Sequence, residues 1–363
     1  MRETTNQRSI IVALSGGVDS AVAASRLVED GGTVIGMTLE LRSAQEGGPA
    51  VPGPEAIGQA RAVSQQLGIP FHVVDAREAF QRDVVDYFIA EYAAGRTPNP
   101  CVRCNQLIRF GLLMERALEL GADALATGHY ARIREVDGTY QLLRGRDRDK
   151  DQSYFLHALN QEQLAHTRFP LGHMTKKQVR DWARRHDLPV AGRAESQDVC
   201  FLMDGDYRTF LEEQAPHTLR PGPILDTAGR VLGEHRGLAA YTIGQRKGLN
   251  VSASEPLYVM AIQPQENAIV VGTAEELGWD QCLVEELHTI GGSTPRRPFH
   301  AQAQIRYRAR PVPVMVHPLP NERAEVRFSE TQRDVTPGQF LVLYRGDVVL
   351  GGGTICEAQN SML

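Results

Sequence analysis

The feature of this 363-residue chain that most constrains its fold is an apolar run leading through two glycines into a helical pattern. Residues 9–14 (SIIVAL) are rich in β-branched side chains and predict a strand, and apolar residues recur at helical spacing from Val18 onward. The loop between them, residues 15–20 (SGGVDS), puts N–H groups and hydroxyls at a helix N-terminus, where anions bind. It lacks the Gly-Lys-Ser/Thr of the kinase-type loop. The loop predicts a nucleotide phosphate site, with an ordinary glycine-rich turn as the alternative.

Short strands and amphipathic helices continue to alternate along the first half of the chain. The pattern predicts strands at residues 33–39 and 71–74 and helices at residues 55–67, 83–92, 107–120 and 176–186. This alternation indicates an α/β fold whose parallel sheet is covered by helices on both faces, with ligands at the carboxyl ends of the strands. The 15–20 loop occupies such an end. Residues 43–54 are rich in Gly and Pro and predict a mobile loop.

The second half of the chain has a different pattern. Glycine and proline become frequent after about residue 206, and short alternating strands dominate from residue 286, which indicates a small β-barrel or sandwich. Residues 304–310 are expected to form a strand with Arg306, Arg308 and Arg310 on one face. Taken alone, this stripe fits a solvated strand face. The sequence thus predicts three parts: an α/β domain at residues 1–205, a small adaptor at 206–285 and a β-barrel at 286–363.

Composition excludes several classes of protein. The chain has a formal net charge of -5, which argues against a generic nucleic-acid binder with a basic face. Its five cysteines are too few and too scattered for a disulfide scaffold. No apolar run reaches membrane-spanning length, and the polar residues 1–8 do not resemble a signal peptide. We expect a cytoplasmic protein with no membrane partner.

A second motif, residues 97–105 (TPNPCVRCN), leads into a predicted helix. Pro100 suits the opening of a helix, so Cys101 and Cys104 are expected in its first turn, where the helix dipole and Arg103 would lower their pKa values. Cys104 is therefore a candidate nucleophile. The alternatives are half of a zinc site, which would need a second ligand pair, and a redox pair, which would not explain the phosphate loop. We predict no mononuclear metal site.

Several motifs together carry a resemblance to known enzymes. The SGGVDS loop resembles the pyrophosphatase loop of the N-type ATP pyrophosphatases. In family order, the chain also carries TPNPCVRCN, TGHYA (127–131), KDQSYFL (150–156), SQDVCF (196–201) and YTIGQRKGL (241–249). These motifs span nearly the whole chain and resemble those of bacterial tRNA-specific 2-thiouridylases. The resemblance implies a parallel-sheet ATP-pyrophosphatase domain, like the adenine nucleotide alpha hydrolases, followed by an adaptor and a C-terminal β-barrel.

The resemblance also implies a reaction and its residues. We expect ATP with Mg²⁺ to adenylate O2 of the tRNA wobble uridine, which turns a poor leaving group into AMP. Cys200 then carries a persulfide from a sulfur-transfer protein or a cysteine desulfurase, and catalytic Cys104 releases its sulfur by forming a disulfide with Cys200. Positions matching the ATP site are Ala13, Leu14, Ser15, Gly16, Gly17, Val18, Asp19, Ser20, Leu39 and Gly128. Positions matching tRNA contacts are Asn99, Pro100, Cys101, His129, Lys150, Asp151, Gln152, Arg306, Tyr307 and Gln339.

One departure from the family pattern adds a third thiol. Cys101 stands where some family members have aspartate, so an acid/base role of that carboxylate does not transfer to this chain. Cys101, Cys104 and Cys200 could instead ligate an iron–sulfur cluster, as in some related tRNA thiolases. Two rival functions stay open: another N-type pyrophosphatase that adenylates a carboxylate or amide, and a non-catalytic RNA-binding protein with a redox or iron–sulfur centre.

Overall fold

The computed structural model describes residues 9–42, 54–194, 199–202, 206–293 and 295–360. Most of the predicted loop at 43–54 lies outside the described residues, as do Ser196, Gln197 and Asp198 of the SQDVCF motif. Among the helices of the described residues, none combines the length and the apolar character needed to cross a membrane.

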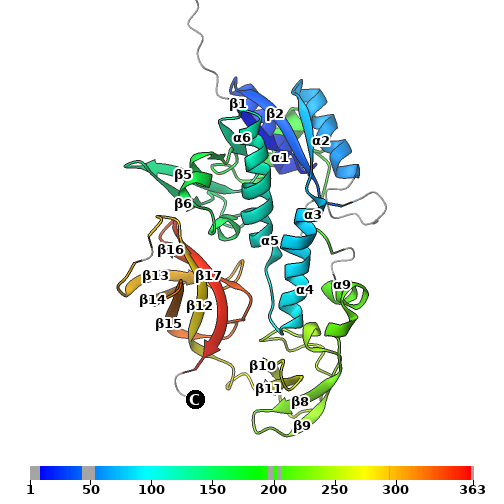
Figure 1. The fold of residues 1–363 in the computed structure, drawn as a ribbon, viewed down its shortest axis with the longest axis vertical. Coiled ribbons are helices and arrows are strands. Elements are labelled where there is room, and N and C mark those ends of the chain that lie inside the picture. Colours follow the sequence, from blue (N-terminus) through cyan, green and yellow to red (C-terminus); the bar gives the residue numbers. More distant parts are fainter. Residues whose placement is uncertain (1–8, 43–53, 195–198, 203–205, 294, 361–363) are drawn as a thin grey trace, which may run out of the picture.

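The N-terminal half is built on a five-stranded parallel sheet with the order β3-β2-β1-β4-β7 (Figure 1). Its strands are β1 (Ser9–Ala13), β2 (Thr33–Glu40), β3 (Phe71–Asp75), β4 (Ala124–Ala126) and β7 (Thr167–Arg168). Val12 of the central strand pairs with Gly36 on one side and Ala126 on the other. The predicted strands and their parallel arrangement are confirmed.

Helices cover both faces of this sheet, because neighbouring side chains of β1 point to opposite sides. Val12 packs into a core with α1 (Val18–Glu29), α2 (Pro54–Leu67) and α8 (Lys176–Arg185). The hydroxyl of Thr175 and the side chain of Gln178 form a capping box that starts α8. Ile11 faces the other core, which the next group of helices covers.

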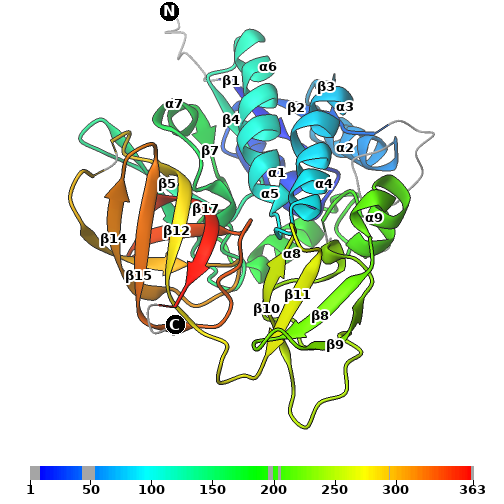
Figure 2. The same cartoon turned by 60° about the horizontal axis from the view of Figure 1, so that its bottom comes forward.

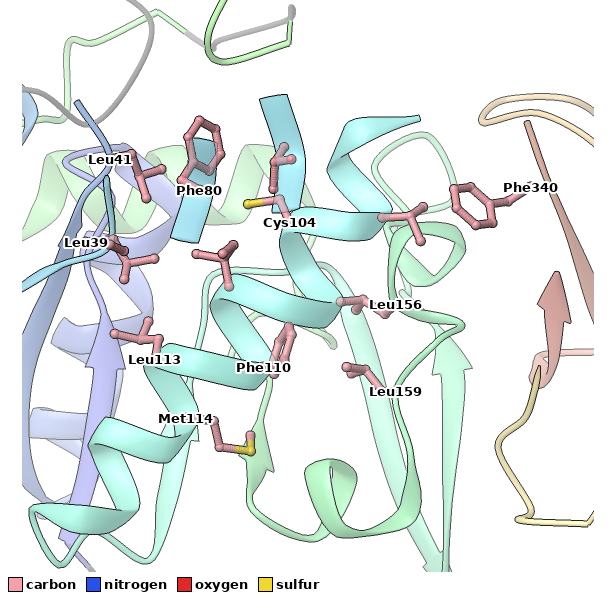
Figure 3. Packing of buried hydrophobic residues seen from close by; sticks show 14 of the residues in the cluster. Leu39, Leu41, Phe80, Cys104, Phe110, Leu113, Met114, Leu156, Leu159 and Phe340 are labelled. Carbon is pink, nitrogen blue, oxygen red and sulfur yellow. The ribbon is translucent and has the colours of Figure 1, made fainter. Parts of the chain in front are cut away.

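That second group consists of two helical columns, one running from α3 to α4 and the other from α5 to α6 (Figure 2), and each contains a π-helical segment. It consists of α3 (Arg77–Phe80), the π-helical η1 (Gln81–Val85), α4 (Asp86–Ala93), α5 (Pro100–Arg103), the π-helical η2 (Cys104–Leu113) and α6 (Met114–Glu119). Figure 3 shows Cys104 among the apolar side chains of this core, on the helical run that also carries Phe110 and Leu113. Cys104 is thus part of a packed interior.

The central segment forms a separate small sheet with the order β10-β11-β8-β9. Its elements are α9 (Tyr207–Gln214), η4 (Pro216–Thr218), β8 (Gly222–Asp226), β9 (Val231–His235), η5 (Leu238–Ala240), β10 (Tyr258–Gln263) and β11 (Ala268–Gly272). Ile224, Val259 and Ile269 lie in its own apolar core. This sheet therefore has a core distinct from those of the parallel sheet.

The C-terminal segment is a six-stranded β-barrel, closed by pairing of β12 with β17. Its strands are β12 (Trp279–Thr289), β13 (Phe299–Gln304), β14 (Val312–Leu319), β15 (Arg323–Gln332), β16 (Phe340–Arg345) and β17 (Val348–Gln359). β12 begins at Trp279, so the barrel includes residues before the predicted boundary at 286. The prediction of an α/β domain followed by a β-barrel is confirmed.

The barrel is joined to the α/β half through a hairpin and a shared core. The hairpin β5 (Ala131–Val136) and β6 (Thr139–Arg144) extends the barrel sheet through β17, where Val348 pairs with Leu143. Short elements η3 (Ser153–Leu156) and α7 (Gln161–Ala165) follow the hairpin. Phe340, Val342 and Tyr344 of the barrel belong to the same apolar cluster as Ile11. The two parts therefore pack as one body.

The predicted strand at residues 304–310 is wrong beyond its first residue. β13 ends at Gln304, and the chain turns at Arg306–Ala309, where the Ala309 N–H donates to the Arg306 carbonyl at 3.0 Å. Arg308 has a φ of 71°, which a strand does not allow. The three arginines consequently do not form a stripe on a strand face.

Candidate functional site

A pocket lies at the carboxyl ends of β1, β2 and β4, where a parallel sheet is expected to bind its ligand. It is lined by the following residues: Ala13, Leu14, Ser15, Asp19, Ser20, Met37, Thr38, Leu39, Leu41, Arg109, Leu113, Thr127, Gly128, His129 and Gln152. Most of the predicted ATP positions are therefore brought together. We call this the nucleotide pocket.

The loop before α1 has a conformation that depends on glycine at two places. Gly16 has a φ of +74°, and a Cβ there would lie 2.6 Å from the Ala56 carbonyl oxygen of α2. A Cβ on Gly128 would lie 2.8 Å from the backbone nitrogen of Ser20. The Ser15 N–H donates to Ser20 Oγ at 3.1 Å, which closes the loop. Any side chain at Gly16 or Gly128 would push the loop away from its neighbours.

The start of α1 offers backbone donors to an anion. Gly17 is the N-cap residue and has no side chain, so no side-chain hydrogen bond caps the first turn. The first N–H groups of a helix have no partner within the helix, and the helix dipole favours negative charge there. The hydroxyl of Thr38 in the pocket wall is buried and has no hydrogen-bond partner among the described residues. Both features fit a polar, anionic ligand such as ATP.

Asp19, in the first turn of α1, is held by two residues that the sequence did not predict. Lys176 Nζ lies 2.7 and 2.8 Å from its carboxylate oxygens, and the hydroxyl of Tyr130 donates to Oδ1 at 2.9 Å. Lys176 is the first residue of α8, where the sequence pattern correctly predicted the start of a helix. Its proximity to Asp19 had no sequence signal, because the two residues are far apart along the chain.

A second pocket, the cysteine pocket, adjoins the first. Its lining consists of Phe80, Val84, Pro100, Cys101, Cys104, Asn105, Arg109, His129, Gln152, Phe155, Val199, Cys200 and Phe201. Cys104 and Cys200, which are nearly one hundred positions apart, therefore face one space together with Cys101. All five cysteines of the chain are free thiols in this structure.

The predicted activation of these thiols by the helix dipole and Arg103 is wrong. Burial raises the pKa of Cys101 to about 11 and also raises the pKa values of Cys104 and Cys200. Arg103 points elsewhere: its guanidinium lies 4.9 Å from the ring centre of Tyr87 and 3.4 Å from Glu286 Oε2. Removal from water outweighs the favourable end of a short helix, so the thiols are protonated at neutral pH.

Arg109, His129 and Gln152 line both pockets and form the wall between them. His129 is buried, its Nδ1 lies 2.8 Å from Thr127 Oγ1, and burial lowers its pKa to about 3. Its imidazole is therefore neutral. Gln152 Oε1 accepts a hydrogen bond from the Tyr130 N–H at 3.0 Å, which fixes the side chain in the wall. A nucleotide in one pocket would lie next to thiols in the other.

Several predicted tRNA positions meet where the barrel touches the start of α5. Gln339 Nε2 donates to the Thr97 carbonyl at 2.8 Å, and the Thr97 N–H donates to the Pro337 carbonyl at 2.9 Å. Asn99 is the N-cap residue of α5, and Pro100 opens the helix. The ring of Tyr307 lies 4.3 Å from that of Phe155, which lines the cysteine pocket.

Arg306 and Asp151 make internal contacts. The Arg306 guanidinium donates to the Ile243 carbonyl at 3.2 Å and to Thr336 Oγ1, and burial lowers its pKa. Asp151 is buried, accepts from Arg144 at 2.9 Å and also accepts the Gly145 N–H. Lys150 is half-buried, and its N–H donates to the Asp147 carbonyl at 3.2 Å. These contacts give Arg306 and Asp151 structural roles.

Family models match three consecutive segments of the chain. Residues 8–204 match a model described as the tRNA methyl transferase HUP domain, residues 208–273 match the tRNA methyl transferase PRC-barrel domain, and residues 279–355 match the aminomethyltransferase beta-barrel domain. The first model alone covers more than half of the chain.

Curated relatives match over nearly their whole length. The tRNA-specific 2-thiouridylase MnmA of Magnetococcus marinus is 49% identical over 97% of this chain and 99% of its own. The enzyme of the same name from Moorella thermoacetica is 49% identical over 95% of this chain and 98% of its own. A solved 4-thiouridine synthetase–RNA complex with bound ATP is only remotely similar, with 17% identity and a TM-score of 0.37 over 58% of this chain and 50% of that one.

Proposed function

Because this chain belongs to the family of tRNA-specific 2-thiouridylases, we propose that it replaces O2 of a tRNA wobble uridine with sulfur in an ATP-dependent reaction. The observation that carries this proposal is the common wall of the nucleotide and cysteine pockets. An activated uridine in that wall would be within reach of both the nucleotide and the thiols. A ligase that adenylates a carboxylate would have no use for the thiols.

The nucleotide pocket would bind ATP through the first turn of α1. Its N–H groups and the hydroxyls of Ser15 and Ser20 would hold the pyrophosphate part, while Leu39 would pack beside the adenine. Asp19 is the carboxylate that would hold Mg²⁺ beside the phosphates. The ion would neutralise phosphate charge. Transfer of AMP to uridine O2 releases pyrophosphate and turns that oxygen into a leaving group.

The cysteine pocket would deliver sulfur to the activated base. A sulfur-transfer protein or a cysteine desulfurase would load Cys200 as a persulfide, whose terminal sulfur attacks uridine C2 as the C2–O bond breaks and AMP leaves. The Cys104 thiolate then attacks Cys200 Sγ. The S–S bond breaks, its electron pair stays with the sulfur on C2, and Cys104 and Cys200 become a disulfide. A dithiol reductant must restore the two thiols before the next cycle.

The iron–sulfur alternative fits these residues less well. Cys101, Cys104 and Cys200 line one pocket, but the described residues contain no group of three or more His, Cys, Asp or Glu side chains arranged to hold a metal ion. We therefore route no step through a cluster. Cys101 would instead lie beside the target base without taking part in sulfur transfer.

The tRNA would contact more than one part of the chain. We propose that residues 1–205 form the catalytic domain, that the segment from 206 to the start of β12 acts as an adaptor, and that the barrel from Trp279 onward holds the tRNA. Asn99, Lys150, His129 and Gln339 would lie near the bound RNA. An acidic protein can do this when a local positive site focuses the field. With this proposed substrate and these proposed partners, the protein would act in the cytoplasm.

Sulfur loading and sulfur delivery can be separated by single substitutions. Cys200→Ser should take up no labelled sulfur, whereas Cys104→Ser should take it up and fail to form thiouridine. Cys101→Ser should retain substantial activity, and Cys282→Ser, buried in the barrel, is the matched control. The measurements are protein-bound sulfur label, thiouridine in digested tRNA and iron content, all on anaerobically purified protein. Thiouridine formation by Cys200→Ser would refute the persulfide route. Stoichiometric iron in the wild-type protein, with loss of both iron and activity in Cys101→Ser, would establish the cluster route.

A further inference from the structure

Arg109 occupies a special position in the wall between the two pockets. Of the described residues that line the cysteine pocket, it alone carries a formal charge at neutral pH, because the thiols and His129 are neutral there. Among the residues that line the nucleotide pocket, Arg109 is the one Lys or Arg side chain. The negative charge of Asp19 in the same lining is already paired with Lys176, at 2.7 Å. A single guanidinium thus faces both spaces.

The π-helical segment η2 explains how Arg109 reaches this position. Its i→i+5 hydrogen bonding places residue 109 about one turn after Cys104, on the same side of the helix. The neighbours Ile108 and Phe110 are fully buried in the apolar core and hold the backbone in place. The Arg109 side chain then lines the same pocket as Cys104, and its positive charge opposes the rise in the pKa of that thiol. The local helix geometry therefore supplies a rigid base for the charge.

Both pockets would hold anions during the reaction. A thiolate or persulfide in the cysteine pocket has lost its hydration, and Arg109 is the charged group that opposes the rise in the pKa values of Cys101, Cys104 and Cys200. The phosphate that links AMP to the uridine carries a second negative charge. A fixed cation facing developing negative charge in a dry site stabilises it more than water-exposed lysines could.

Resting on the proposed thiolation, we propose that Arg109 is a catalytic residue that binds the Cys104 sulfur anion and the phosphate of the adenylated uridine from its place in the wall. It would stabilise the nucleophile and hold the leaving AMP in line. This role is separate from the persulfide on Cys200 and from the phosphate loop at residues 15–20.

The test uses Arg109→Gln, with Arg109→Lys as the variant that keeps the charge and Arg103→Gln as the matched control. Arg103 directly precedes Cys104 but pairs with Glu286 instead. Each variant is made in the full chain with Cys101→Ser and Cys200→Ser. Two quantities are measured without tRNA or sulfur donor: the iodoacetamide alkylation rate of Cys104 against pH, by peptide mass spectrometry, and ATP affinity, by calorimetry.

Arg109→Gln should slow Cys104 alkylation about tenfold at a given pH, since loss of a nearby opposite charge shifts a pKa by about one unit or more. It should also weaken ATP binding, while Arg109→Lys recovers part of both effects and Arg103→Gln matches its parent. Loss of only one of the two effects, or an equal effect in Arg103→Gln, would overturn the proposal. Both effects, together with no thiouridine formed by the wild-type chain when ATP, tRNA and a sulfur donor are supplied, would refute the thiolation and leave the two anion contacts standing.

Discussion

Replacing Gly16 by alanine should weaken ATP binding more strongly than its effect on the free energy of unfolding alone would predict. At a φ of +74° an added Cβ costs about 1–2 kcal/mol from backbone conformation alone. The same Cβ would lie 2.6 Å from the Ala56 carbonyl oxygen, which must retreat by about 0.8 Å to reach the 3.4 Å of an ordinary contact. Because the Ala56 backbone is held within helix α2, the oxygen cannot retreat by this distance, and the loop at residues 15–20 has to move instead.

Gly31 provides the matched control. Its φ is +80°, but an added Cβ would have no neighbour within 4 Å, so Gly31→Ala carries the conformational cost without the clash. We expect Gly31→Ala to bind ATP like the wild type. Gly16→Ala should lose more stability than the control and should bind ATP at least tenfold more weakly, since shifts of this size in a positioned site can cost 10²-fold.

The stability of the sheet domain can be followed by one fluorophore. The chain has two tryptophans, and Trp182 packs beside the α1 core while Trp279 lies in the barrel. In a Trp279→Phe background, urea unfolding followed by Trp182 fluorescence reports on α1 and α8. Calorimetry gives the ATP affinity of the same samples. Equal loss of stability in the two glycine variants, or wild-type ATP affinity in Gly16→Ala, would refute this account of the loop.

Three further substitutions probe other contacts. Asp19→Asn should abolish pyrophosphate release and leave tRNA affinity unchanged. The control Asp30→Asn, at the exposed end of the same helix, should leave both pyrophosphate release and tRNA affinity unchanged. Normal release by Asp19→Asn would contradict the Mg²⁺ assignment. Burial lowers the pKa of His157 to about 4, so the unfolded chain binds its extra proton between pH 4 and 6.5, and stability is lost as pH falls through that window. His157→Gln should reduce the stability lost between pH 7 and pH 5 by about 2 kcal/mol, measured by urea unfolding, and an unchanged pH dependence would place the loss elsewhere. Arg306→Gln should weaken tRNA binding without changing its salt dependence, because the guanidinium contacts Ile243 and Thr336; a slope lowered by about one would reveal a phosphate contact.

Local patterns in the sequence predicted the parts of the fold that depend on neighbours along the chain. The strand, loop and helix around Ser15 followed from apolar spacing and two glycines, and Pro100 correctly marked the start of a helix. Alternation of strands and helices extended this to the parallel sheet, and short alternating strands after residue 286 indicated the barrel. Each of these features is encoded within a few residues, so no knowledge of distant contacts was needed.

The errors arose where distant residues decide the outcome. Alternation alone favoured a strand through Arg306, but the side chain is drawn to Ile243 and Thr336, and the chain turns to allow it. Arg103 precedes Cys104 in sequence yet points to Glu286, while burial by other segments raises the thiol pKa. Lys176 and Arg109 could not be assigned to the pockets before the chain was folded.

The hairpin that joins the barrel to the α/β half limits how this protein can be dissected. A fragment ending near residue 205 would expose β6 along the edge that now meets β17, and open strand edges promote aggregation. The buried hydroxyl of Tyr154 would also lose the Phe340 carbonyl, to which it donates at 2.8 Å. Fusions and labels are better placed in the turn between β8 and β9, at the exposed Ala228 and not at Gly229, whose φ of +80° disfavours a side chain.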